Sequence, residues 1–165
     1  MKIPEHIAVQ IRRALSPLGA SVKRVGEDWV EVSGASVKPG RHIAVYVRDP
    51  FDFDVQIHMP ERRGSPFEQV IVGTPEEAQD IQATVVQFVA DLVEERLVVA
   101  MDNRIFRGGH RFLTPSNMRK ANLRHLSWVA SWRGTFDSDN PPLDNVLQLK
   151  LCHGPRTSSR DTSLN

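Results

Sequence analysis

The sequence predicts an α+β domain, in which an N-terminal helix and a long amphipathic helix pack on one face of an antiparallel sheet of five or more strands. Three observations support this prediction. Several segments alternate apolar and polar residues with a period of two, which is typical of strands with one buried face. Two other segments repeat apolar residues every three or four positions, as helices do. The segments follow one another as helix, five strands, helix and further strands.

The N-terminal segment has the spacing of a helix. Its apolar residues fall on one stripe, at Ile7, Ile11, Leu15 and Leu18. Pro4 suits a first helical turn, since the N–H that proline lacks would have no partner there. Pro17 and Gly19 are typical of a helix end.

The next part of the chain predicts strands. Apolar residues alternate with polar ones, most clearly in the fourth segment, where Phe53, Val55, Ile57 and Met59 alternate with Asp54, Gln56 and His58. We expect five strands, at 21–25, 29–33, 41–48, 53–59 and 67–72.

The best-defined boundary is the start of the second helix. Thr74 can cap the helix, Pro75 suits its first turn, and Glu77 completes a reciprocal capping box. A wide apolar face follows, which suits a helix lying across a sheet. Its residues are Ala78, Ile81, Val85, Phe88 and Leu92 on one stripe, and Val86, Val89 and Val93 on the next. Beyond this helix we expect strands at 97–101, near Phe112 and at 126–136.

Length and composition favour one domain. The chain has 165 residues, of which 40% are hydrophobic and 25% charged, both ordinary globular values. We expect residues 1–140 to form a single α+β domain and residues 141–165 to form a C-terminal extension, because Pro141-Pro142 interrupts the chain. From about residue 154 the composition is mainly Ser, Arg, Thr and Asp, and we expect this end to be mobile.

Some classes of protein lose support from the sequence. No stretch approaches the roughly 18 apolar residues of a membrane-spanning helix. Glu5 and His6 lie where a secretory signal would be apolar, and the single Cys152 cannot form an internal disulfide. We therefore expect a cytoplasmic protein without a membrane partner. The common nucleotide-binding, zinc-protease and hydrolase motifs are absent as well, so we predict no cofactor, no metal site and no catalytic set.

Charge is segregated along the chain. Residues 1–102 contain 11 basic and 16 acidic side chains, whereas residues 103–136 contain seven basic side chains and no carboxylate. The seven are Arg104, Arg107, Arg111, Arg119, Lys120, Arg124 and Arg133. Such asymmetry bears on partners rather than on fold.

Two interpretations of segment 103–136 remain open. Its cations could bind an anionic partner, either an acidic protein surface or a nucleic acid, with its aromatic residues stacking on bases. Alternatively, the arginines pair with the acidic residues of the preceding helix and the aromatic residues fill the core. Leu126, Trp128, Ala130 and Trp132 share one strand face, which favours core positions for the two tryptophans.

The most specific candidate site in this segment is a glycine-containing loop. Two glycines let backbone N–H groups approach an anion, and flanking guanidinium groups could hold it. A plain hairpin turn needs the same glycines. The candidate binding residues are Arg104, Arg107, Gly108, Gly109, His110 and Arg111.

A second candidate site is the polar face of the hairpin formed by 41–48 and 53–59. If paired positions sum to 100, His42 lies opposite His58 and Tyr46 opposite Asp54; if they sum to 102, Arg48 lies opposite Asp54. Two imidazoles and a carboxylate could perform acid–base chemistry or form half of a metal site. A solvated face stabilised by cross-strand pairs explains the same residues.

Three classes of function remain. The first and favoured one is a non-enzymatic binding or adaptor protein that engages an anionic partner through segment 103–136, with a protein preferred over a nucleic acid. The second is a small-ligand domain with a cavity between the long helix and the sheet, lined by Ile81, Val85, Phe88 and Trp128. The third is an enzyme that uses His42, Asp54 and His58. Neither the partner's identity nor the oligomeric state follows from the sequence.

Overall fold

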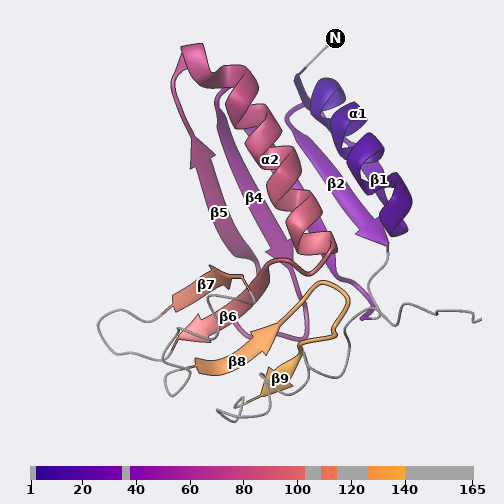
Figure 1. The fold of residues 1–165 in the computed structure, drawn as a ribbon, viewed down its shortest axis with the longest axis vertical. Helices are drawn as coiled ribbons and strands as arrows, with labels where there is room; N and C mark the ends of the chain where they lie inside the picture. The colour runs from indigo at the N-terminus through magenta and orange to yellow at the C-terminus, as the bar shows by residue number, and fades with distance from the viewer. Residues whose placement is uncertain (1–2, 35–37, 103–108, 115–125, 140–165) are drawn as a thin grey trace, which may run out of the picture.

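The computed structural model describes residues 3–34, 38–102, 109–114 and 126–139 (Figure 1). The predicted C-terminal extension, residues 141–165, lies entirely outside these residues. Among the described helices, none is long and apolar enough to cross a membrane.

The order of elements agrees with the predicted α+β class. The first part of the chain contains α1 (Ile3–Leu15), a 3-10 turn (Ser16–Leu18), β1 (Ala20–Val25), β2 (Trp29–Gly34), β3 (His42–Asp49), β4 (Asp52–His58) and β5 (Phe67–Val72). The second part contains a 3-10 turn (Pro75–Glu77), α2 (Ala78–Val93), β6 (Val98–Asp102), β7 (Gly109–Leu113), β8 (Leu126–Ala130) and β9 (Ser138–Asp139).

The described strands form two antiparallel sheets. The first is a meander in the order β1-β2-β3-β4-β5, and the second has the order β7-β6-β8-β9. Figure 1 shows the smaller sheet at one end of the five-stranded sheet. One hydrophobic cluster includes residues of α1, α2 and both sheets, so the core is continuous between them.

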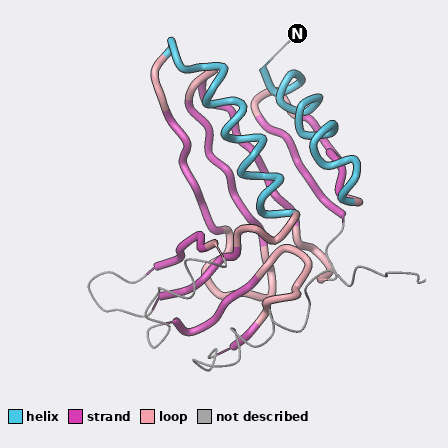
Figure 2. Tube along the Cα trace, viewed as in Figure 1, coloured by secondary structure: helices cyan, strands magenta, loops and turns pink. Residues whose placement is uncertain are grey.

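Both helices cover the same face of the five-stranded sheet (Figure 2). On α1, Ile7, Ile11 and Leu15 are fully buried, as their spacing predicts. On α2, Val85, Val89 and Val93 are fully buried, and they belong to the same cluster as the inward-facing residues of the strands. Alternation along β3 and β4 places every second residue in this core, so the intervening residues lie on the opposite face.

The predicted start of the second helix is confirmed in detail. The side chain of Thr74 accepts a hydrogen bond from the N–H of Glu77, and the Glu77 carboxylate accepts one at 3.0 Å from the N–H of Thr74. These reciprocal bonds add side-chain acceptors for two backbone donors at the helix start, of which the N–H of Glu77 also donates to the carbonyl of Thr74 at 3.0 Å. The first turn, Pro75–Glu77, is a 3-10 turn that continues into α2.

The strand predicted at 126–136 is shorter than expected. β8 ends at Ala130, and the chain then turns through Gly134, whose φ is +87°. The strand ends because side-chain carboxylates accept hydrogen bonds from the backbone N–H groups that follow Ala130. Glu95 accepts from the N–H of Arg133 at 2.9 Å, and Asp137 accepts from the N–H of Ser131 at 3.0 Å. A continued strand would need those N–H groups for ladder bonds.

Candidate functional site

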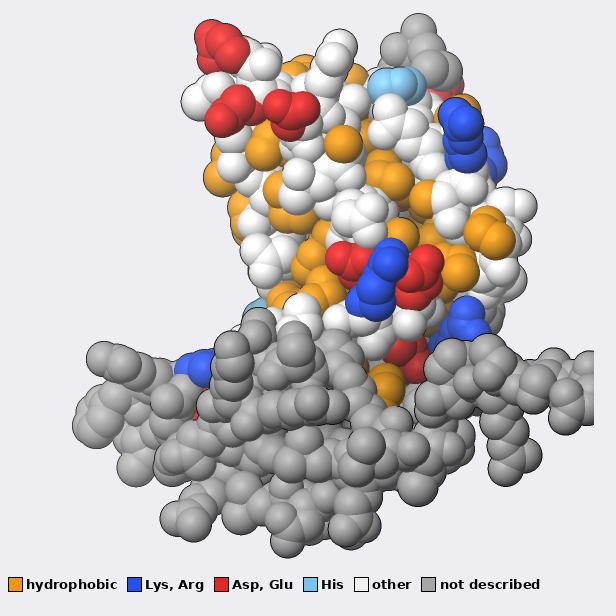
Figure 3. All heavy atoms as spheres, in the orientation of Figure 1, with side chains coloured by type: hydrophobic (Ala, Val, Ile, Leu, Met, Phe, Trp, Pro, Cys, Tyr) orange, Lys and Arg blue, Asp and Glu red, His pale blue; other side chains and the backbone are white. Residues whose placement is uncertain are grey.

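The face of the five-stranded sheet opposite the helices combines polar, aromatic and aliphatic side chains. We call it the open face. It is defined by Trp29 and Glu31 on β2; His42, Tyr46 and Arg48 on β3; Asp54, Gln56 and His58 on β4; and Glu68, Val70 and Val72 on β5. Val70 and Val72 are 46% and 61% exposed, values that place them among the exposed large hydrophobic residues of the chain. The helix-bearing face, seen in Figure 3, instead carries apolar and acidic side chains over α2.

The β3–β4 hairpin has the first of the two predicted registers. His42 pairs with His58, and Tyr46 pairs with Asp54. A register shift between Val47 and Asp49 brings Asp49 opposite Asp52, so only Pro50 and Phe51 connect the two strands. A bulge of this kind adds one unpaired residue and increases the local twist.

The two paired histidines stack on each other. Their ring centroids lie 4.2 Å apart and their planes differ by 10°. The Nδ1 of His42 donates to the carbonyl of Gly40 at 3.1 Å, whereas the Nε2 of His58 is buried with no hydrogen-bond partner. Burial lowers the pKa of His58 from its ordinary value of 6.5, and nearby His42 lowers it further, against a smaller opposite effect of Glu31. The neutral imidazole is therefore the form that the fold favours.

Asp54 is the most deeply buried acidic group of the open face. The residue is 5% exposed and its carboxylate faces a hollow. Its Oδ2 accepts a hydrogen bond from Gln56 at 2.9 Å and lies 3.7 Å from the guanidinium of Arg48, whereas its Oδ1 has no partner. A buried carboxylate oxygen without a donor is uncommon in folded proteins.

The structure separates the residues that the enzyme hypothesis would bring together. Asp54 and His58 lie four positions apart along β4, a separation of roughly 13 Å at strand rise. The hollow beside Asp54 is lined by Tyr46, Arg48 and Gln56 but by neither histidine. Within the described ranges, no group of three or more His, Cys, Asp or Glu side chains could hold a metal ion.

The predicted basic loop is described only in part. Arg104, Arg107 and Gly108 lie outside the described residues, while Gly109, His110 and Arg111 begin β7 and are exposed. Arg111 forms an ion pair at 3.1 Å with Asp102, whose side chain is buried. The Nε2 of His110 donates to the carbonyl of Glu68 at 2.8 Å, which places the ring beside the outer edge of β5.

The two arginines of segment 103–136 that the structure describes, Arg111 and Arg133, both contact acceptors inside the protein. The remaining one, Arg133, donates to the carbonyls of Val93 and Leu18 at 3.3 and 3.1 Å. These partners differ from the predicted ones, because Asp102 is on β6 and the acceptors of Arg133 are backbone carbonyls. The acidic residues Asp91 and Glu94 of the helix end pair instead with Arg96, at 2.8 and 2.7 Å.

The two tryptophans of this segment lie in the core, as their strand spacing predicts. Trp128 is 9% exposed and Trp132 is 1% exposed, and the indole N–H of Trp132 donates to the carbonyl of Gly34 at 3.0 Å. Trp128 and Val85 belong to the main hydrophobic cluster, and Ile81 and Phe88 pack against it. These are the residues proposed to line a ligand cavity, and each of them has a place in core packing.

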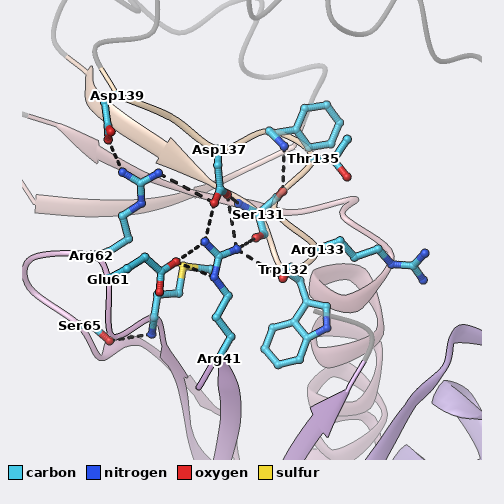
Figure 4. A network of polar contacts seen from close by, with 12 residues as sticks. Arg41, Glu61, Arg62, Ser65, Ser131, Trp132, Arg133, Thr135, Asp137 and Asp139 are labelled. Carbon is cyan, nitrogen blue, oxygen red and sulfur yellow. Dashed lines mark hydrogen bonds and ion pairs between the residues drawn. The ribbon is translucent and has the colours of Figure 1, made fainter. Parts of the chain in front are cut away.

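Sequence patterns did not indicate a buried polar cluster around Arg41. Figure 4 shows Arg41 from the start of β3 between Glu61 and Asp137, with Arg62 and Asp139 beside them. Arg41 donates to both carboxylates and to the carbonyl of Ser131. Its side chain is fully buried, so the cluster joins the five-stranded sheet to the turn after β8 rather than forming an accessible site.

Comparisons with known proteins add no relative: no family model matches the chain, and neither a curated protein nor a solved structure is similar to it.

Proposed function

We propose that this protein is a non-enzymatic binding module whose protein partner docks on the open face. The observation that carries the proposal is the position of both helices on one side of the five-stranded sheet, which leaves aromatic and aliphatic side chains on the other. Trp29 and Tyr46 are cross-strand neighbours there, and Val70 and Val72 extend the apolar area along β5. Trp, Tyr and Arg are enriched at the centres of protein interfaces.

The polar groups of the open face fit recognition better than acid–base catalysis. A general base must reach its proton within hydrogen-bonding distance, usually with a second group that orients it. His42 and His58 stack on each other instead, and the Nδ1 of His42 is bonded to a backbone carbonyl. Asp54 lies away from both rings and beside Tyr46, which favours a role in orienting a bound partner.

Photo-crosslinking from the open face tests this proposal. A benzophenone amino acid is placed at Val72, which is 61% exposed on β5, or at the matched control position Val9, which is 51% exposed on α1. Inside the producing cell, we expect a crosslinked product of one defined mass from position 72 and none from position 9. Tyr46→Ala should suppress that product, because it removes an aromatic contact from the same face.

Three outcomes would contradict the proposal. Equal crosslinking from positions 72 and 9 would mean that collisions, not a specific surface, produce the adducts. A product of twice the chain's own mass of 18.6 kDa would identify the covering surface as a second copy of this protein. If Tyr46→Ala left the crosslinked product unchanged, the partner would not be bound to the open face.

The basic segment supports a second proposal, an anionic partner at residues 103–136. The feature that favours it is the exposed start of β7, where a Cβ on Gly109 would meet nothing within 4 Å and Arg111 keeps 42% of its side chain exposed. Binding to heparin at low salt tests it. If about four anionic groups are neutralised, affinity should fall roughly a hundredfold between about 50 and 200 mM salt. Absence of heparin binding at low salt would refute this proposal.

A further inference from the structure

A hollow of about 450 Å³ opens on the open face beside Asp54. It is lined by Asp28, Tyr46, Val47, Arg48, Asp54 and Gln56. A second hollow, of about 530 Å³, shares Asp28, Val47 and Arg48 with the first, so the two adjoin. We call the two adjoining hollows the groove; it reaches from Asp54 on the open face to the β3–β4 turn and to Ile3 and Pro4 at the start of α1.

Asp54 offers an unused acceptor to this groove. Its side chain is 7% exposed, and its Oδ1 is a buried oxygen without a hydrogen-bond partner. The other oxygen, Oδ2, accepts from Gln56, which holds the carboxylate in one orientation. A buried acceptor without a partner carries a desolvation cost, which a donor that reaches it would relieve.

Arg48 does not supply that donor. Its guanidinium lies 3.7 Å from Oδ2, which is beyond hydrogen-bond length, and 57% of its side chain is exposed. An exposed arginine at this distance makes only a weak ion pair and can move aside at little cost. Arg48 therefore competes weakly for the position that an incoming cation would take.

The charge of the groove favours a cationic ligand. The residues that line the two hollows include four carboxylates and one cation, Arg48. The carboxylates belong to Glu27, Asp28, Asp49 and Asp54. Close charges of one sign raise the local concentration of an oppositely charged group and steer it to the site.

The shape of the site selects among cations. Tyr46 lies directly opposite Asp54 on the neighbouring strand, so an aromatic side chain and a carboxylate face the hollow together. A planar guanidinium can stack on an aromatic ring while two of its N–H groups reach a carboxylate, which a compact ammonium does less well. In the described part of the chain no set of side chains could hold a metal ion.

We infer that the groove at Asp54 receives an arginine side chain from the protein partner. This inference rests on the proposed function, which it sharpens by naming what the partner presents to the open face. The guanidinium would pair with the carboxylate of Asp54 and lie against Tyr46, while Arg48 turns outward.

Titration of the full chain with L-argininamide tests the inference, with backbone amide signals followed by NMR. We expect saturable shifts at Tyr46, Asp54 and Gln56, and none with L-citrullinamide, which has nearly the same shape but no charge. Asp54→Asn should weaken argininamide binding about tenfold or more, because it removes the charged acceptor. Arg48→Gln should strengthen binding about threefold, since it removes a weak competitor.

The matched control is Asp91→Asn, which removes the same charge from α2, where Asp91 pairs with Arg96. It should leave the titration unchanged. The inference is overturned if the wild-type chain gives no saturable shift, if citrullinamide binds as well as argininamide, or if Asp54→Asn binds like the wild type. Should Asp54→Asn fail to fold, Arg48→Gln decides, because unchanged or weaker binding by that variant would also overturn the inference.

The two proposals fail separately. A specific crosslinked partner at position 72 without argininamide binding would overturn the arginine inference and leave the proposed function standing. Argininamide binding without any crosslinked partner would overturn the proposed function of a protein-binding module.

Discussion

Arg41 and Asp137, which lie 96 positions apart in the chain, form an ion pair that fastens the first strand of the β3–β4 hairpin to the turn after β8. The Arg41 side chain is fully buried and that of Asp137 is 12% exposed. Burial lowers the pKa of Arg41, but hydrogen bonds to Asp137 and Glu61 outweigh that effect and leave the pKa raised. Arg41 therefore stays charged, and the two carboxylates compensate its buried charge.

Breaking this pair should strongly destabilise the fold. We expect Arg41→Met to lower the free energy of unfolding by about 3–5 kcal/mol, because Asp137 and Glu61 would be left without their buried cation. Urea denaturation measures the change. Arg96→Met is the matched control, since Arg96 is 55% exposed where it pairs with Asp91 and Glu94, and it should cost less than about 1 kcal/mol. Similar losses for the two variants would contradict a central role of Arg41.

Sequence reasoning succeeded where the signal was local. The alternation of β3 and β4 and their short connection leave two pairings that keep one face apolar, and the structure has the first of them. The capping box at Thr74 is readable because its partners lie three positions apart. The same locality explains why α1 and α2 could be placed from spacing alone.

Long-range contacts gave no comparable signal. Arg41 is preceded by a glycine in the sequence and its partners lie 20 and 96 positions away, so nothing nearby marks it as buried. The end of β8 depends on Glu95, whose carboxylate accepts hydrogen bonds from the backbone N–H groups of Arg133 and Thr135 in the turn that follows the strand. The unpartnered oxygen of Asp54 is likewise a property of the packed sheet, because sequence shows the carboxylate but not its surroundings.

The capping box gives a prediction about α2. Thr74→Ala removes the side-chain acceptor for the N–H of Glu77 and should lower the free energy of unfolding by about 0.5–2 kcal/mol. Thr84→Ala is the control, because Thr84 is exposed within α2 and its hydroxyl donates to the carbonyl of Asp80 one turn earlier in the same helix. Alanine is the better helix former, so that variant should be neutral or slightly stabilising. Thermal unfolding of both variants decides whether the cap matters.

Gly26 positions an aromatic residue of the open face. A Cβ at Gly26 would overlap the indole of Trp29. Gly26→Ala should therefore displace Trp29 and destabilise the fold by about 1 kcal/mol or more. In a Trp29→Val background the same change should cost nothing, or stabilise slightly, because alanine restricts the unfolded chain. Urea denaturation of the wild type, the two single variants and the double variant measures the cost of Gly26→Ala in both backgrounds. An equal cost in both would show that overlap with the indole is not the cause.

The stacked histidines predict a dependence of stability on pH. The pKa of His58 is lowered in the fold, so between the folded and unfolded pKa values the unfolded chain binds more protons. The stabilising contribution of neutral His58 is complete above its unfolded pKa and is lost as the pH falls through its folded pKa. Urea denaturation between about pH 7.5 and pH 5 should show a decline. His58→Gln should remove that part of the decline, since glutamine does not titrate.

His42 provides the variant that tests the cause. Its proximity is one of the effects that lower the pKa of His58, so His42→Gln should raise that pKa and move the loss of stability to higher pH, over a smaller total change. Burial of His58 would still keep its pKa below the unfolded value, so part of the decline should persist. NMR titration of the His58 ring measures the shift directly. An unchanged His58 titration in the His42→Gln variant would exclude electrostatic coupling across the stack, and a pH profile that His58→Gln leaves intact would assign the decline to other groups.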